Sequence, residues 1–199
     1  MPDLRDSETA KNLMRAFAGE SQARNRYTFA AALARFQKMP VVEQIFTYTA
    51  NQEKEHAEIF YKFLEPLDKE TIFIDGGYPV DMEQNTLAQL NAAAHNEFEE
   101  HDVVYKSFGD IAKEEGFARI GNVFHMIAEI EKTHGERFQH LADRLGSGKL
   151  FISDVKTGWV CLNCGHIHFG TEAPQMCPIC QHEQGYFVSV ELAPWYLGR

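Results

Sequence analysis

The sequence predicts a mainly α protein, a four-helix bundle with a long crossover followed by a small C-terminal metal-binding domain. Three observations carry this prediction. Apolar residues recur in alternating steps of three and four along four long segments, as one face of a helix requires. Each of these apolar stripes also contains acidic or imidazole side chains. All four cysteines of the 199-residue chain lie close together near its C-terminus.

The first helix pair is expected over residues 7–36 and 40–64. Ser7 is a good N-cap for the first helix. Pro40 suits the first turn of the second helix, and Pro66 ends it.

A long irregular connection, residues 65–85, contains two prolines and a pair of glycines. A connection of this length lets a second helix pair dock beside the first, as in ferritin-like bundles. The third helix is expected over about 86–113 and the fourth from Gly116 to about residue 145. On the third helix the period places Val104 on the inward stripe and leaves Tyr105 one step away from it.

The motif Glu-x-x-His occurs twice on the apolar stripes, in the second and the fourth helix, and the other two helices carry inward glutamates. The inward polar residues are Glu20, Glu53, His56, Glu97, Glu100, Glu131 and His134. Glu20 precedes Glu53 by 33 residues, and Glu97 precedes Glu131 by 34. This duplicated spacing indicates two related helix pairs that each contribute half of one site.

Five inward carboxylates need a source of positive charge, because an ionised group in an apolar interior is costly unless it is paired. Two divalent cations would leave the five glutamates with a residual charge of −1, and so would two trivalent cations with a bridging oxide. A glutamate from each of two helices and a Glu-x-x-His from each of the others form the carboxylate-bridged dimetal site of four-helix bundles. Glu100 is a candidate ligand beyond that set.

The remainder of the chain is rich in β-branched and aromatic residues and is too small to fold on an apolar core alone. Two Cys-x-x-Cys pairs predict a tetrahedral metal site formed by Cys161, Cys164, Cys177 and Cys180. Their spacing fits either structural zinc or a single redox-active iron, and the adjacent dimetal bundle favours iron. We expect a bundle over 1–146, a linker over 147–158 and a metal domain with its own core over 159–199.

Composition and charge exclude several classes of function. The net charge of −10 argues against nucleic-acid binding. No apolar run approaches the ~20 residues of a membrane span, and the N-terminus does not resemble a secretory signal, so a cytoplasmic protein is expected. No Gly-x-Gly-x-x-Gly motif is present, so the chain should not itself oxidise a nicotinamide cofactor.

Three stretches resemble the rubrerythrin family: GESQAR at 19–24, ANQEKEHA at 50–57 and the pair Cys161-x-x-Cys164 followed by Gly165. The resemblance covers nearly the whole chain and implies a ferritin-like di-iron bundle with a C-terminal rubredoxin-like domain that holds one iron.

The resemblance also implies roles for the inward residues. Glu53 and Glu131 would bridge two irons, which carry an oxo bridge when oxidised. Glu20 would be a terminal ligand of the first iron, and Glu97 and His134 of the second.

The first iron would exchange Glu100 and His56 as its redox state changes. Tyr27 and Tyr105 would donate hydrogen bonds to carboxylate ligands. We expect His56, Glu100 and the two tyrosines to support catalysis.

The implied activity is the reduction of hydrogen peroxide to water. Electrons would pass from the four-cysteine iron to the di-iron site and would come from NAD(P)H through a separate protein, such as a rubredoxin or a reductase. The dimetal centre should lie roughly 15–20 Å from either bundle end. A head-to-tail homodimer would therefore bring the cysteine site of one chain close to the bundle of the other.

Two alternatives use the same residues. A ferritin-like iron oxidation or storage protein would account for the bundle but leave the cysteine site unexplained. A manganese-containing catalase-like bundle with a structural zinc ribbon would account for both sites, and metal analysis distinguishes it from the iron protein.

Overall fold

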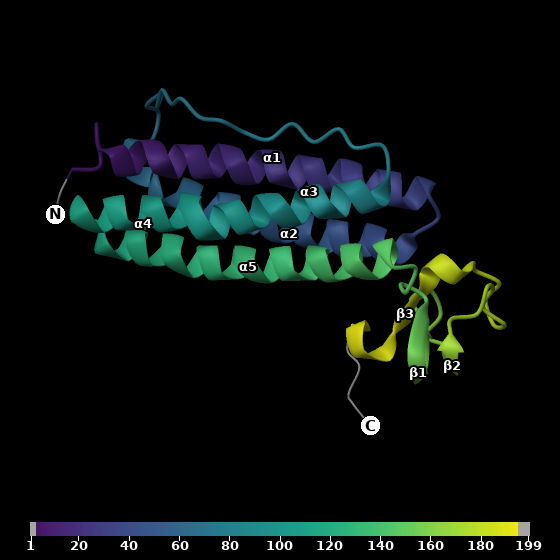
Figure 1. Ribbon diagram of the computed structural model, residues 1–199. Coiled ribbons are helices and arrows are strands. Elements are labelled where there is room, and N and C mark those ends of the chain that lie inside the picture. The colour runs from purple at the N-terminus through teal and green to yellow at the C-terminus, as the bar shows by residue number, and fades with distance from the viewer. Residues whose placement is uncertain (1–2, 195–199) are drawn as a thin grey trace.

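The computed structural model describes residues 3–194 and contains a long helical bundle with a small domain at one end (Figure 1). The bundle consists of α1 (Glu8–Phe36), α2 (Pro40–Phe63), α3 (Thr86–Glu99), the π-helix η2 (Glu100–Val104), α4 (Tyr105–Glu114) and α5 (Ala118–Gly146). Because α3, η2 and α4 follow one another without a break, they form one long helix, and the bundle has the four helices that the sequence predicts.

Both helix-start signals that the sequence predicts for the first helix pair are found in the structure. The Ser7 side chain accepts a hydrogen bond from the backbone of Ala10 and so caps α1. Pro40 occupies the first turn of α2. The third helix has a cap as well, since the Asn85 side chain accepts from the backbone of Ala88.

The third helix differs from the expected uninterrupted helix. Its π-helical turn adds one residue, so every inward position beyond it moves one place along the sequence. Tyr105 is therefore buried at 2% exposure, whereas Val104 is only partly buried. The prediction that Val104 lies on the inward stripe was wrong, because it assumed a regular 3.6-residue period and the π-helical turn interrupts that period.

The first helix also departs in one detail from a simple stripe. Its buried face includes Leu13, Glu20 and Tyr27, but Arg24, which the alternating steps of four and three also place on this face, is exposed.

Two apolar clusters fill the bundle. One contains Tyr27, Phe46 and Phe138, and the other contains Phe60, Tyr105 and Phe124. The crossover, residues 68–85, has no regular secondary structure and runs along the bundle beside α1 (Figure 1). No helix in the described part of the chain is both long enough and apolar enough to cross a bilayer.

The small domain contains an antiparallel sheet of β1 (Ile152–Cys161), β2 (Ile167–Glu172) and β3 (Phe187–Ser189), in the order β2-β1-β3. Its core includes the fully buried Trp159 and Phe187. Part of the segment expected to be a linker, 147–158, is thus structured, because β1 already begins at Ile152. The last residues of the expected metal domain, 195–199, lie outside the described residues.

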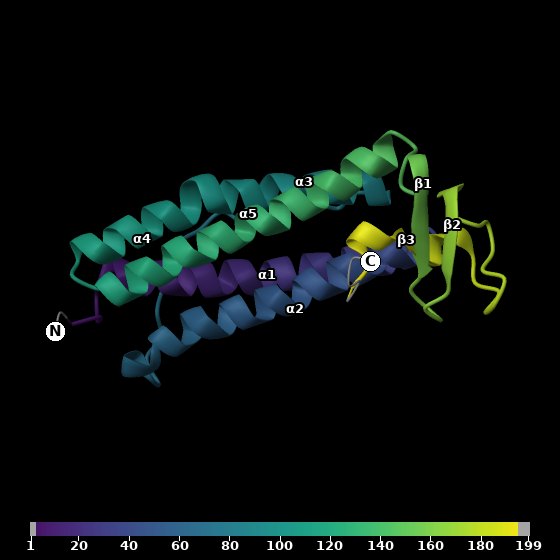
Figure 2. The same cartoon turned by 90° about the horizontal axis from the view of Figure 1, so that it is seen from below.

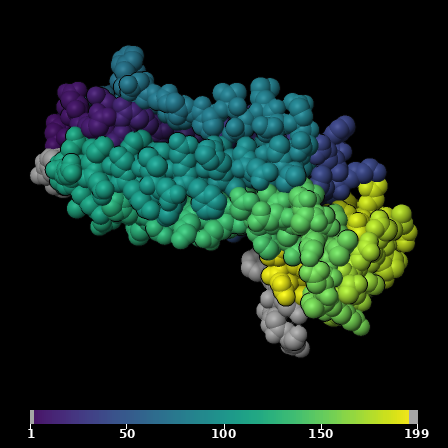
Figure 3. All heavy atoms as spheres, viewed as in Figure 1, coloured from purple at the N-terminus to yellow at the C-terminus, as the bar shows by residue number. Residues whose placement is uncertain are grey.

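The small domain packs against the bundle end where α1 turns into α2 (Figures 2 and 3). Glu183 forms an ion pair with Lys38 in that turn at 2.8 Å. Gly185 lies so close to the turn that an added Cβ would stand 2.1 Å from the Lys38 carbonyl oxygen. The small domain has its own cluster, and Leu150 and Val188 in addition join the first apolar cluster of the bundle, so the two cores are in contact.

Candidate metal centres

The inward residues of the bundle form two overlapping groups. Within each group the candidate ligand atoms all lie within 4.8 Å of one another. The first group is Glu20, Glu53, His56 and Glu131, and the second is Glu53, Glu97, Glu131 and His134. All of these residues are buried, and Glu53 and Glu131 belong to both groups.

The shared carboxylates each offer one oxygen to either side. Glu131 places Oε1 2.9 Å from His56 Nδ1 and Oε2 2.8 Å from His134 Nδ1. Glu53 places Oε2 and Oε1 at 3.1 Å from the same two nitrogens. The two imidazole rings are nearly parallel, with centroids 5.7 Å apart. This is the geometry that two bridging carboxylates between two metal ions require.

The position of this polar layer follows from a seven-residue spacing. Glu53 lies midway between Phe46 and Phe60 in α2, and in α5 Glu131 has the same relation to Phe124 and Phe138. Seven residues are about two helical turns, so all of these side chains lie on one face. The ligand layer is therefore enclosed between two layers of aromatic rings.

Several buried polar atoms in this layer have no hydrogen-bond partner among the described residues. They are Glu20 Oε2, Glu97 Oε2, both carboxylate oxygens of Glu53 and of Glu131, His56 Nδ1, and both ring nitrogens of His134. Buried polar atoms without partners are rare in folded proteins because each costs about 1–3 kcal/mol. Here the atoms converge on common points without hydrogen-bond geometry, so the residues present fit two cations.

The electrostatics of the metal-free site agree with this fit. Burial, together with the charge of Glu53, raises the pKa of Glu97 to about 8. Burial opposes the protonation of His56, but the carboxylates of Glu131 and Glu53 outweigh it and raise its pKa to about 9. Without metal, protons take the place of the missing positive charge, and metal binding would displace them.

Two tyrosines hold the terminal carboxylates in a reciprocal arrangement. Tyr105, which begins α4, donates a hydrogen bond of 2.7 Å to Glu20 of α1. Tyr27 of α1 donates to Glu97 of α3. Burial raises the pKa of both phenols well above its ordinary value, so both remain protonated donors. Each carboxylate thus has one oxygen restrained by a tyrosine and the other directed at the metal site.

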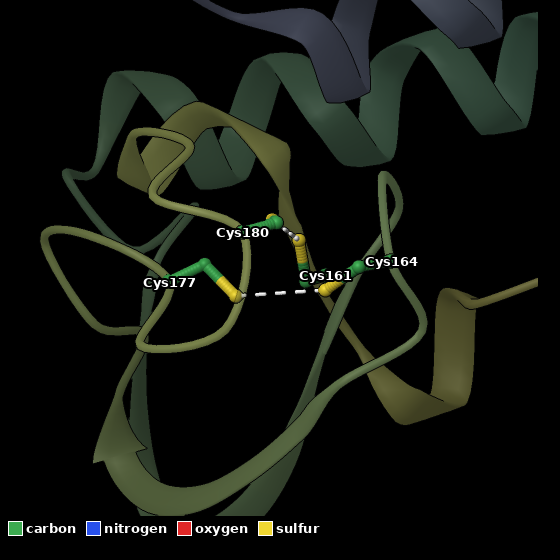
Figure 4. Close-up of side chains that lie close together, drawn as sticks. All are labelled: Cys161, Cys164, Cys177 and Cys180. Atoms are coloured by element: carbon green, nitrogen blue, oxygen red, sulfur yellow. Dashed lines mark hydrogen bonds between the residues drawn. The ribbon is translucent and has the colours of Figure 1, made fainter.

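The four cysteine sulfurs form a second site in the small domain (Figure 4). The Sγ atoms of Cys161 and Cys180 are 3.7 Å apart, and those of Cys164 and Cys177 are 3.6 Å apart. A tetrahedral site with metal–sulfur bonds of about 2.3 Å has sulfur–sulfur edges of about 3.8 Å. The sulfurs are therefore already placed for one tetrahedral ion.

The two cysteine pairs form matching turns. Cys161 N–H donates to the His166 carbonyl, and Cys177 N–H donates to the His182 carbonyl, both at 2.8 Å. Gly165 and Gln181 occupy equivalent places with positive φ angles of 77° and 60°. The sequence signals the first left-handed position through its glycine but gives no signal for Gln181.

Comparisons with known proteins agree with both sites. A sequence model of rubrerythrin matches residues 11–142, and one of the rubrerythrin rubredoxin-like domain matches residues 159–188. The chain is 46% identical to a rubrerythrin from Clostridium perfringens, covering 94% of this chain and 96% of that protein. It is 42% identical to a rubrerythrin from Nitratidesulfovibrio vulgaris, with the same coverage. The chain belongs to the rubrerythrin family.

Solved structures of related proteins show the same architecture. Fully reduced nigerythrin aligns with a TM-score of 0.62 and 27% identity, covering 94% of this chain and 92% of that one. Symerythrin from Cyanophora paradoxa, at 18% identity and a TM-score of 0.55, covers 65% of this chain and supports the fold alone. As a rubrerythrin family member, the chain combines a di-iron site with a four-cysteine rubredoxin-like site.

Glu100 is the one candidate ligand that neither bundle group includes. It opens the π-helix and is only partly buried, whereas His56 occupies the first group. Burial and the nearby carboxylates raise the pKa of Glu100 well above its ordinary value. The family resemblance implies that His56 and Glu100 exchange as ligands of the first iron, and this arrangement corresponds to the state in which His56 is the ligand. The exchange itself stays a prediction.

Proposed function

We propose that this rubrerythrin family protein reduces hydrogen peroxide to water, using two electrons and two protons for each peroxide. The observation that carries the proposal is the presence of two ligand sets in one chain, a carboxylate-bridged pair for two ions and a separate cysteine site for one. When bound, the iron pair would supply two electrons and Lewis acidity at the peroxide oxygens.

The bundle residues would set the conditions for this chemistry. Glu53 and Glu131 would hold the two ions together, with Glu20 and His56 on one and Glu97 and His134 on the other. The aromatic layers on both sides exclude water from the ligand layer.

Protons must reach the departing oxygens. We assign this delivery to the carboxyl group of Glu100, because it is close to the ligand layer but not part of it. Burial raises the pKa of the Glu100 carboxyl group, so the group would be protonated and able to donate.

Electrons would arrive through the four-cysteine iron. Thirteen residues separate Pro40, at the end of α2 where the small domain packs, from Glu53, which corresponds to roughly 20 Å along the helix. The cysteine site therefore lies far from the di-iron site of its own chain. We infer a head-to-tail homodimer in which electrons cross between chains, and a separate NAD(P)H-linked protein as the donor.

The test compares iron and zinc in the cysteine site while the bundle keeps its iron. Zinc fits the same tetrahedral site and keeps the small domain folded, but it cannot transfer electrons. We expect chemically reduced zinc-substituted protein to reduce peroxide once and then stop, whereas the all-iron protein continues with a protein donor. Sustained turnover by the zinc form would contradict the proposed route, and failure of the first turnover in both forms would contradict the peroxidase function.

A further inference from the structure

A small cavity of about 120 Å³ lies beside the ligand layer, between α1, the start of α4 and the crossover. Glu100 and Tyr105 line its inner side, and Tyr105 is the residue that donates to Glu20. Gly77, Tyr78 and Pro79 of the crossover line its outer side. The cavity therefore lies between solvent and the edge of the di-iron site.

The Tyr78 ring is held in place at this outer side. Its hydroxyl donates a hydrogen bond of 3.1 Å to the Arg15 carbonyl, and an added Cβ on Gly19 would lie 3.6 Å from the ring. The ring thus rests on α1 while 37% of the residue remains exposed. The partly exposed ring thus forms part of the cavity wall on its solvent side.

Polar contacts on both sides of Tyr78 hold the crossover to the bundle. Before it, the Arg15 guanidinium donates to Asp75 Oδ1 at 2.7 Å. After it, Gln22 Nε2 donates to the Pro79 carbonyl at 2.6 Å, and Asn96 Nδ2 donates to Asp81 Oδ2 at 2.7 Å. The segment around Tyr78 is therefore restrained on both flanks even though it has no regular secondary structure.

We propose that Tyr78 is a size-selecting residue that admits hydrogen peroxide to the di-iron site and excludes bulky organic hydroperoxides. A volume of about 120 Å³ is well below the ~300–1,000 Å³ of pockets that take drug-sized ligands, so it suits a molecule of a few heavy atoms. The polar groups of Glu100 and Asn96 in its lining suit a hydrogen-bonding guest. The choice of peroxides as substrates rests on the proposed function, but the size limit does not.

The activity test uses Tyr78→Ala, with Phe73→Ala as the matched control. Phe73 belongs to the same crossover, is 85% exposed and does not line the cavity. We expect Tyr78→Ala to raise the kcat/KM for cumene hydroperoxide relative to hydrogen peroxide by roughly tenfold or more, the scale on which pockets discriminate by size. Phe73→Ala should keep the wild-type ratio.

A second measurement does not depend on peroxide chemistry. Bipyridine is larger than the cavity can hold, whereas azide is small. In Tyr78→Ala we expect faster removal of ferrous iron from the bundle by bipyridine, with unchanged binding of azide to the oxidised protein. Wild-type rates of bipyridine removal and a wild-type hydroperoxide ratio in Tyr78→Ala would overturn the proposal. Absence of peroxide reduction in every variant would instead count against the proposed function, and the bipyridine and azide rates would still decide the size limit.

Discussion

At the scale of single residues, orientation of the ligand carboxylates depends on two phenol groups. Tyr27 and Tyr105 come from different helices, and each restrains the glutamate of the opposite helix. A ligating carboxylate that is held by a hydrogen bond keeps one oxygen free for the metal. The tyrosines therefore prepare the site before metal arrives.

Tyr105→Phe removes the hydrogen bond to Glu20 and keeps the aromatic packing. We expect metal affinity or peroxide activity to fall by roughly 10–100-fold, as is usual when a ligand loses its hydrogen-bond partner. Thermal unfolding should change little. Tyr61→Phe, at a residue that is 57% exposed, is the control. Equal effects of the two substitutions would show that the hydroxyl of Tyr105 has no special role.

At the scale of secondary-structure elements, the π-helix accommodates one extra residue between Glu97 and Tyr105 and so keeps Tyr105 at the site. In α1 the inward residues Leu13, Glu20 and Tyr27 are separated by seven residues each, whereas eight separate Glu97 from Tyr105. The extra residue is taken up by the π-helical turn. Tyr105 thus reaches a place equivalent to that of Tyr27 in the related helix pair.

Deletion of Val103 tests this account. Val103 lies in the π-helix and is 61% exposed. Its removal should convert the turn to α-helix and leave the later residues facing inward as before. We expect undiminished helical circular dichroism and a preserved effect of Tyr105→Phe on metal affinity in the shortened chain. Loss of the Tyr105→Phe effect, or of the helical bundle, in the shortened chain would contradict the assignment of one extra residue to the π-helical turn.

A second element-scale feature joins the two helix pairs. The Glu115 carboxylate, at the α4–α5 turn, accepts hydrogen bonds from the backbone N–H groups of Glu8 and Thr9 at 3.0 and 2.8 Å. Glu115 therefore provides hydrogen-bond acceptors for two backbone N–H groups in the first turn of α1, which have no partner within that helix. Partial burial opposes ionisation, but these hydrogen bonds outweigh it, so the pKa of Glu115 is lowered.

Glu115→Gln should lower the free energy of unfolding at pH 7 by about 1 kcal/mol, the usual contribution of a helix cap. Because the folded-state pKa is lowered, the contribution is present above the unfolded-state value of about 4.5 and is lost as the pH falls through the folded-state value. The difference between wild type and variant should therefore shrink in acid. Denaturant unfolding across this pH range, with exposed Glu114 changed to Gln as the control, measures it; a difference that persists in acid would contradict the assignment.

At the scale of the whole molecule, the periodic features could be predicted and the tertiary ones could not. Helix bounds followed from Ser7 and Pro40, and the seven inward candidate ligands followed from the apolar period. The inward orientation of Tyr105 could not be predicted, because a π-helical turn leaves no clear signal in one sequence. The start of β1 and the docking of the small domain could not be predicted either, because they depend on contacts between distant segments, such as Gly185 with Lys38.

Docking of the small domain should depend on Gly185. Gly185→Ala would place a Cβ 2.1 Å from the Lys38 carbonyl, so the two parts must move apart. We expect faster proteolysis in the segment 147–158 with an unchanged spectrum of the cysteine-bound iron. Gly77→Ala, whose Cβ would meet nothing within 4 Å, is the control. Unchanged proteolysis in Gly185→Ala would contradict the docked arrangement.

We propose that both metal sites act in one electron path. The direct measurement is an anaerobic titration of the fully reduced protein with hydrogen peroxide, followed by the visible absorption of the sulfur-ligated iron. Two bundle irons and one cysteine-bound iron hold three electrons, so we expect this absorption to reach full intensity at about 1.5 peroxides per chain. Absorption that does not return with peroxide, or that is complete at about half a peroxide per chain, would contradict it.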